Sequence, residues 1–216
     1  MKNIQIDSDR LWLSLMKMAK IGATKKGGNC RLALTDLDAE CRNLFIKWCE
    51  DAGCTVSVDG VGNIFARRVG RDDSLPPIVF GSHLDTQPTG GRFDGVLGVM
   101  AGLEVMRTLN DNALETNAPI EVVNWTNEEG SRYSPAMMGS GVFAGIFDQA
   151  EVMAKEDGDG KSFGDELERT GFAGTAPVGG RDIGAYFELH IEQGPILEAE
   201  EKTIGVVTDA QGQRWY

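Results

Sequence analysis

The sequence has 216 residues, of which 41% are hydrophobic and 25% are charged, which is enough for one substantial core in an ordinary globular protein. Its net charge of −12 argues against nucleic acid or an anionic membrane surface as a partner, because both are bound through basic patches. The sequence contains neither an apolar run approaching the roughly 18 residues of a membrane span nor a signal-peptide core, and its four cysteines form no C-x-x-C pair, so we expect a cytoplasmic protein with reduced thiols.

The first third of the chain predicts two helices followed by a β-hairpin. Residues 7–18 and 35–53 repeat apolar side chains at helical spacing, and each segment begins with residues that commonly cap helices. Residues 54–58 and 63–68 alternate in polarity as strands, with a Gly-containing turn between them. The apolar positions that define the helices are Leu11, Leu15 and Met18 in the first and Cys41, Leu44, Phe45 and Trp48 in the second.

Three later apolar segments, 78–80, 120–125 and 185–191, predict strands. Between the first two, residues 95–109 keep helical period, and their small residues would let the helix lie close to a sheet. Residues 148–182 are acidic and Gly-rich and predict loops with one short helix. Alternation of strands and helices indicates an α/β fold, which we expect to have three layers and a mostly parallel central sheet.

Polar side chains follow each of these three strands. His83 follows the first strand, His190 lies at the end of the third, Glu128 and Glu129 follow the second, and Asp94 opens the helix. Ligands of such sheets bind beyond the carboxyl ends of the strands. A single histidine at a strand end is usually structural, and adjacent glutamates on a loop are usually solvated. The sequence has only two histidines, however, and both stand at such ends, which favours a metal site.

Imidazole nitrogens and carboxylate oxygens together suit Zn²⁺, or Mn²⁺, Co²⁺ or Ni²⁺ by substitution. Asp85 stands two residues after His83 and is expected to hold the tautomer of that imidazole. The side chains of Glu128 and Glu129 are expected to diverge, as neighbours in an extended chain do. One of them can then bind a metal ion while the other faces a water molecule as general base.

Three motifs resemble those of the metal-dependent amidohydrolases of the M20 peptidase clan: GSHLDTQPTGGRFDGVLGV, NEEGSRYSPAMMGS and ELHIEQGPILE. Within that clan the sequence is most similar to N-carbamoyl-L-amino-acid hydrolases, with β-ureidopropionase and allantoate amidohydrolase as close relatives. The resemblance runs through most of the chain, from the first predicted helix onward.

By this resemblance, His83, Asp94 and His190 hold one divalent metal ion, and Asp94 and Glu129 hold a second. The implied metals are Zn²⁺ or Mn²⁺, with Co²⁺ or Ni²⁺ as alternatives, and two such ions lie about 3.5–4 Å apart. Family members complete the second site with a histidine far downstream. This sequence contains no third histidine, so its second site is incomplete.

The resemblance further implies Glu128 as general base and Gln193 as a contact of the substrate amide. The implied reaction converts an N-carbamoyl-L-amino acid or related ureido substrate to the amino acid, carbon dioxide and ammonia, through a metal-activated water, in a protein that is a homodimer when full-length. Three alternatives remain open: an allantoate amidohydrolase, an M20 aminoacylase or peptidase, and a non-catalytic metal-binding remnant.

The resemblance also predicts domain boundaries. Residues 1–205 correspond to the N-terminal part of the catalytic domain, and residues 206–216 to the first strand of a lid and dimerisation domain. We therefore expect an N-terminal fragment of a longer amidohydrolase, cut at the start of the lid.

The incomplete second site predicts that the 216-residue chain binds one divalent ion tightly and shows little turnover. The measurement is the metal content of the purified protein after loading with Zn²⁺ or Mn²⁺ and exhaustive dialysis. One ion per chain is expected, since only the first site has three protein ligands. Two retained ions per chain, or full hydrolysis of an N-carbamoyl amino acid, would contradict this expectation.

Overall fold

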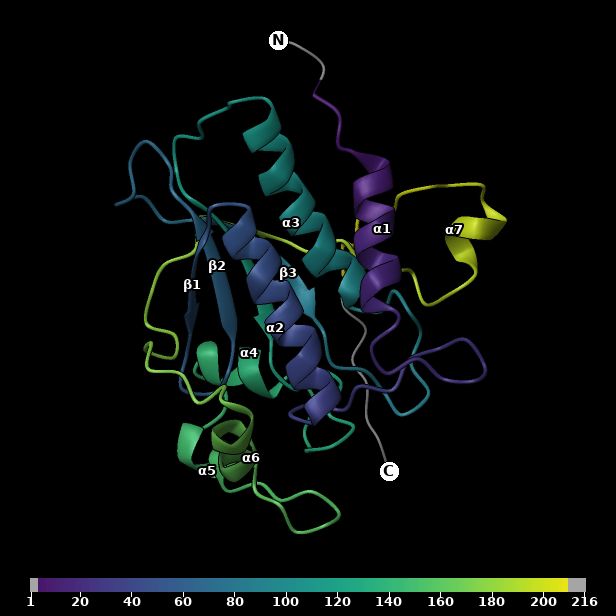
Figure 1. The fold of residues 1–216 in the computed structure, drawn as a ribbon, viewed down its shortest axis with the longest axis vertical. Helices are drawn as coiled ribbons and strands as arrows, with labels where there is room; N and C mark the ends of the chain where they lie inside the picture. The colour runs from purple at the N-terminus through teal and green to yellow at the C-terminus, as the bar shows by residue number, and fades with distance from the viewer. Residues whose placement is uncertain (1–3, 210–216) are drawn as a thin grey trace.

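The computed structural model describes residues 4–209, which form one twisted sheet covered by helices (Figure 1). The strands occur in the spatial order β1-β2-β4-β3-β5. In the part of the chain that the structure describes, the strands are β1 (Thr55–Val58), β2 (Ile64–Arg68), β3 (Ile78–His83), β4 (Ile120–Trp125) and β5 (Ala185–Phe187), and the helices are α1 (Ser8–Met18), α2 (Asp36–Asp51), α3 (Val96–Asp111), α4 (Met138–Phe143), α5 (Gln149–Met153), α6 (Phe163–Thr170) and α7 (Ile196–Ala199).

The central strands β4, β3 and β5 are parallel to one another. Their register places Ile78 of β3 opposite both Ile120 of β4 and Ala185 of β5. The hairpin of β1 and β2 joins this group in antiparallel orientation through β4. The predicted α/β fold with mostly parallel central strands is therefore confirmed, and the carboxyl ends of the three parallel strands meet at one edge of the sheet.

Helices α1, α2 and α3 lie together on one face of the sheet (Figure 1). The main hydrophobic core fills the space between these helices and the sheet. A smaller cluster occupies the opposite face, where Phe143 at the end of α4 and Ile183 pack against strand residues. The fully buried side chains of the main core include Met18, Phe45, Ile64, Val99, Leu103 and Val122.

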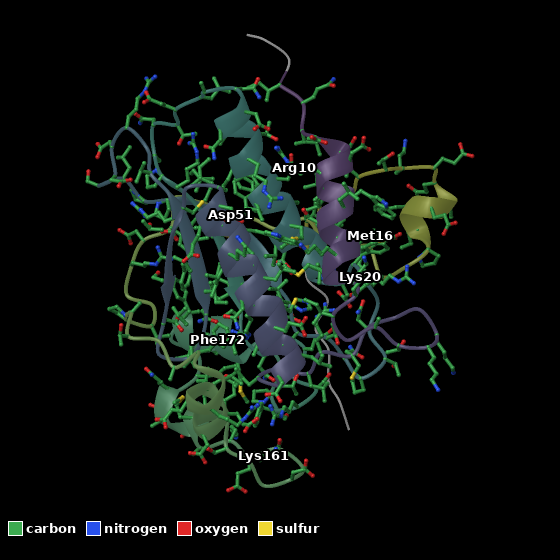
Figure 2. All side chains as sticks on the ribbon, viewed as in Figure 1. Arg10, Met16, Lys20, Asp51, Lys161 and Phe172 are labelled. Carbon is green, nitrogen blue, oxygen red and sulfur yellow. The ribbon has the colours of Figure 1, made fainter. Side chains whose placement is uncertain are left out.

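Side-chain caps and ion pairs fix the helices in this layer. Asp7 caps α1 by accepting a hydrogen bond from the N–H of Arg10, at 2.9 Å. The side chain of Arg10 points from α1 toward α3 (Figure 2), where it donates to the buried carboxylate of Glu104 at 2.7 and 2.9 Å. Because the carboxylate is almost fully desolvated, this charged pair gives α1 and α3 a defined relative position.

Several boundaries differ from those expected. Strand β3 continues to His83, so that histidine ends the strand instead of following it. Strand β5 stops at Phe187, four residues before the predicted end at Ile191, so His190 lies on the segment that follows. The helices α4, α5 and α7 were not predicted, because segments of four to six residues are too short to display helical period.

The predicted lid strand, 206–216, is described only in part. Residues 206–209 adopt no regular structure, and residues 210–216 lie outside the described residues. The assignment of 1–205 and 206–216 to two domains therefore stays a prediction. Among the described helices, none combines the length and the apolar character that crossing a membrane requires.

An ion network ties α6 to the segment before α2. Glu166 accepts hydrogen bonds from Arg132 and Arg169, at 2.7 Å from each. Arg132 also donates to the carbonyl of Ala33, and Arg169 to that of Leu34. The side chain of Glu166 is only 5% exposed, so its charge is compensated by the two guanidinium groups.

This network predicts an acid-dependent loss of stability. Hydrogen bonds from Arg169, together with Arg132 and against the effect of burial, lower the pKa of Glu166 from 4.5 to about 2. The contribution is therefore present above pH 4.5 and is lost as the pH falls toward 2. We expect Glu166→Gln to lower the free energy of unfolding by about 2 kcal/mol at pH 7, measured by urea denaturation, with a smaller difference from wild type at each lower pH.

The matched control is Asp51→Asn, which removes an exposed pair with Lys47 and should change stability by no more than about 0.5 kcal/mol. An equal effect of the two substitutions, or an effect of Glu166→Gln that persists unchanged to pH 2, would contradict the assignment.

Candidate metal centre

Three predicted ligands meet at the carboxyl edge of the parallel strands. His83 ends β3, Asp94 directly precedes the first turn of α3, and His190 follows β5. One ligand atom from each of the three lies within 4.8 Å of the other two. His190 Nε2 is 3.2 Å from Asp94 Oδ1, and the Asp94 side chain is 13% exposed. The sequence prediction of these three residues as one cluster agrees with this geometry.

Both imidazole rings are oriented in the same way. Nδ1 of His83 lies 2.8 Å from the carbonyl oxygen of Asp85, and Nδ1 of His190 lies 2.7 Å from that of Ile191. A carbonyl oxygen can only accept, so each Nδ1 donates, and the neutral form of each ring then has its lone pair on Nε2. The lone pairs of both Nε2 atoms are thus available beside Asp94, which is the donor set that a divalent transition metal requires.

Gly95 allows this approach of β3 and α3. Its φ of +65° is a left-handed conformation, and a Cβ atom there would lie 2.5 Å from the ring of His83. Gly98 similarly packs on the strand, where a Cβ atom would lie 2.9 Å from Ser82 Cβ. Only residues without a side chain fit at these two positions, so α3 can present Asp94 to the two histidines.

Glu128 lies beside the three ligands. Its Oε2 is 3.4 Å from Nε2 of His83. Burial raises the pKa of Glu128, and the carboxylates of Asp85 and Glu129 add to this effect against the opposing effect of His83. A carboxylate whose pKa is raised above its ordinary value is better suited to accept a proton from water. The role of Glu128 as general base stays a prediction.

Glu129 lies outside the group of three ligands. Its Oε2 accepts a hydrogen bond of 3.0 Å from Nε2 of Gln87, and its Oε1 is buried without a hydrogen-bond partner. Asn127 has a left-handed φ of +53°, so the two glutamates stand on a loop and not on an extended strand. The extended chain from which their divergence was expected is therefore absent, and the two side chains make different contacts, Glu128 with His83 and Glu129 with Gln87. The unpaired buried oxygen of Glu129 is chemically suited to a cation.

Asp85 differs from expectation in how it contacts His83. Its backbone carbonyl accepts from the imidazole, whereas its carboxylate Oδ1 is 3.9 Å from Nδ1. The carboxylate instead accepts the backbone N–H groups of Glu128 and Glu129, at 3.2 Å each. The tautomer of His83 is therefore fixed by the main chain at position 85.

Gln193, predicted as a substrate contact, lies at the same centre. It has a left-handed φ of +55°, and its Nε2 donates to Asp94 Oδ2 at 2.8 Å. Sequence reasoning did not identify Gln87, although it stands only two residues after Asp85 in the same motif. Gln87 and Gln193 thus each donate one amide hydrogen to a carboxylate of the centre.

Glu188 is a second residue that sequence reasoning missed, although it precedes His190 by only two positions. It accepts hydrogen bonds from Ser82 Oγ at 2.6 Å and from the hydroxyl of Tyr186 at 2.9 Å. Tyr186 in turn accepts from the indole N–H of Trp125 at 3.0 Å. These bonds fasten the segment that carries His190 to β3 and β4.

A cavity of about 340 Å³ opens beside Glu128. Its wall is mainly apolar, and Glu128 and Glu188 are its two carboxylates. The other lining residues are Trp125, Met137, Ser140, Phe143, Ala144, Ile183 and Tyr186.

Comparison with known proteins gives a consistent result. A model of peptidase family M20/M25/M40 matches residues 79–211. An N-carbamoyl-L-amino-acid amidohydrolase of Rhizobium meliloti is 58% identical over 214 residues, which are 99% of this chain and 51% of that protein. An allantoate amidohydrolase of Bacillus subtilis is 36% identical over 204 residues, or 92% of this chain and 49% of that protein.

Among solved structures, a hydantoinase/carbamoylase family amidase of Burkholderia multivorans superimposes with a TM-score of 0.93 at 63% identity. The match covers 94% of this chain and 49% of that structure. The chain thus spans about half the length of the curated relatives it matches.

The contact between Gly95 and His83 predicts that Gly95→Ala weakens metal binding. The added methyl group would displace the imidazole, and alanine would be strained by about 1–2 kcal/mol at a left-handed φ. We expect the affinity for Zn²⁺, measured by competition with a chromogenic chelator, to fall at least about 10-fold.

Gly91→Ala is the matched control, because a Cβ atom at Gly91 would meet nothing within 4 Å and its φ is not left-handed. It should leave the affinity for Zn²⁺ unchanged. Equal affinities of the two variants would show that the close approach at Gly95 is not needed for metal binding.

Proposed function

This chain belongs to peptidase family M20/M25/M40, and on that basis we propose that it supplies the metal centre and the general base of an amidohydrolase acting on N-carbamoyl-L-amino acids or related ureido compounds. The observation that carries the proposal is the convergence of two imidazole Nε2 atoms, the Asp94 carboxylate and Glu128 at one end of the sheet. The similarity to an N-carbamoyl-L-amino-acid amidohydrolase supports the substrate class.

In this proposal, His83, Asp94 and His190 would hold a divalent ion, which when bound would supply Lewis-acid chemistry toward water and the carbamoyl oxygen. Glu128 accepts a proton from the water molecule that attacks the carbamoyl carbon. The C–N bond to the amino acid then breaks, and Glu128 returns the proton to the leaving nitrogen. The products are the free amino acid and a carbamate, which decomposes to carbon dioxide and ammonia.

Gln193 is proposed to contact the substrate. Its amide nitrogen already donates into the centre, to Asp94 Oδ2, and the side chain is exposed to the edge where a substrate would enter. An amide donor at this position can bind the oxygen of a carbamoyl or ureido group.

The proposal includes a second metal ion, which Asp94 and Glu129 would hold. Glu129 contributes one buried oxygen without a partner, but it lies outside the group of three ligands. The identity of the metal as zinc or manganese, a homodimer of the full-length protein and a cytoplasmic location also belong to the proposal.

The similarity to an allantoate amidohydrolase favours a second candidate substrate of the same chemical type. Allantoate and N-carbamoyl amino acids share the ureido group, so the same metal ion and base would serve both. An N-acyl amino acid, the substrate of an aminoacylase, lacks the terminal amine of that group. Release of amino acid from N-carbamoyl- and N-acetyl-L-methionine, and of ammonia from allantoate, therefore distinguishes the three candidates.

Glu128→Gln tests the base. We expect this variant to lose about 10²–10⁴-fold of the hydrolysis rate of the preferred ureido substrate, since the amide cannot accept the proton. Its affinity for Zn²⁺ should stay within a few-fold of wild type, because Glu128 is not one of the three ligands.

Asp148→Asn is the control, because Asp148 caps the distant helix α5. It should retain the wild-type rate. The wild-type chain loaded with Zn²⁺, Mn²⁺ or Co²⁺ is expected to hydrolyse its substrate slowly, in keeping with its incomplete second site. The proposal fails if no hydrolysis of any of the three substrates is detectable, or if Glu128→Gln hydrolyses its substrate at the wild-type rate.

A further inference from the structure

The carboxylate of Asp85 is one of the most buried charged groups in the described part of the chain, at 2% exposure. Its two oxygens have different partners. Oδ1 accepts the N–H of Glu128 and Oδ2 accepts the N–H of Glu129, each at 3.2 Å. Hydrogen bonds to an ionised acceptor are stronger than those between neutral groups. The side chain thus holds two consecutive peptide units of another loop.

The same carboxylate is not the partner of His83. Its nearer oxygen is 3.9 Å from Nδ1, which is beyond hydrogen-bond distance, while the carbonyl of Asp85 accepts at 2.8 Å. Any residue at position 85 would provide that carbonyl. The requirement for a carboxylate here therefore comes from the loop at Glu128, since the imidazole is already satisfied.

The loop is fastened independently at its two ends. Asn63 Oδ1 accepts the N–H of Thr126, and the carbonyl of Thr126 accepts the N–H of Gly139. The carbonyl of Glu128 accepts the N–H of Met137 at 2.7 Å. The carbonyl of Asn127 likewise accepts the N–H of Met138 at 3.3 Å, so the loop itself holds both peptide units on their carbonyl sides. The two bonds to Asp85 hold the N–H sides of the same units, and they connect the loop to the segment that follows His83.

We propose that Asp85 is a positioning residue that acts through the main chain of Glu128 and Glu129, setting where these two side chains leave the loop. The chemical roles of the two glutamates rest on the proposed function, but the contacts do not. Asp85 thereby fixes the positions of Glu128 and Glu129 relative to His83. It does not orient the imidazole of His83 through its carboxylate.

Amide hydrogen exchange of the whole protein, followed by NMR in the absence of metal, tests this proposal on Asp85→Asn. Asparagine keeps the shape of the side chain but replaces one acceptor oxygen by an NH₂ group. We expect exchange at the Glu128 and Glu129 amides to become about 10- to 100-fold faster. Exchange at Thr126 and Gly139 should not change, because their partners lie elsewhere.

The ring nitrogen shifts of His83 provide a readout that loss of packing alone would not reproduce. In Asp85→Asn we expect the His83 tautomer to be the same as in wild type, because the carbonyl at position 85 is retained. The proposal is overturned if the tautomer changes while exchange at Glu128 and Glu129 does not. It is equally overturned if exchange accelerates uniformly across the sheet.

A measurement on wild type avoids dependence on the folding of the variant. Scalar coupling across hydrogen bonds should connect the amide nitrogens of Glu128 and Glu129 with the side-chain carboxyl carbon of Asp85. Absence of both couplings would overturn the proposal. Both couplings in a protein that hydrolyses no ureido substrate would support the positioning role and reject the proposed function.

Discussion

Helix α3 lies directly against β3, and this contact brings residues of two distant segments into one centre. Gly95, Gly98 and Gly102 face the strand, and a Cβ atom at any of them would lie within 3.0 Å of a neighbouring atom. Glycine lowers helix propensity by about 1 kcal/mol per residue. These glycines therefore make α3 intrinsically less stable, but they allow it to lie closer to β3. The gain is that Asp94, at the positively polarised start of α3, meets His83 at the end of β3.

The residues of the centre have two kinds of hydrogen-bond partner. Backbone carbonyls accept from both imidazoles, and backbone N–H groups donate to the buried carboxylate of Asp85. The side-chain amides of Gln193 and Gln87 donate to Asp94 and Glu129. Main-chain partners do not depend on rotamers, so the histidines and Asp85 are held rigidly, whereas the carboxylates with amide partners can exchange those partners for a cation.

Much of this arrangement could be predicted from the sequence, for identifiable reasons. The periodicity of residues 95–109 predicted α3, and short apolar or alternating segments predicted the hairpin, β3 and β4. The rule that ligands gather at the carboxyl ends of strands predicted that His83 and His190 lie close together. The short helices α4 and α5 and the true end of β5 carry too few repeats to be recognised. The partner of the Asp85 carboxylate could not be predicted, because it depends on how two loops more than forty residues apart meet in space.

Strand β5 is joined to β3 over only three residue pairs, and Ser82 and Glu188, which bond across this edge, are 106 residues apart in the chain. Closing so long a loop is entropically costly and yields few contacts, so this edge is expected to form late in folding and to open early in local unfolding. A cation shared by His83 and His190 would bridge the same edge. Binding of that cation would stabilise the paired state of β3 and β5 by mass action and so lower the population of molecules in which this edge is open. The concentration of free metal ion would then determine how long the edge stays closed, in addition to whether the site can activate water.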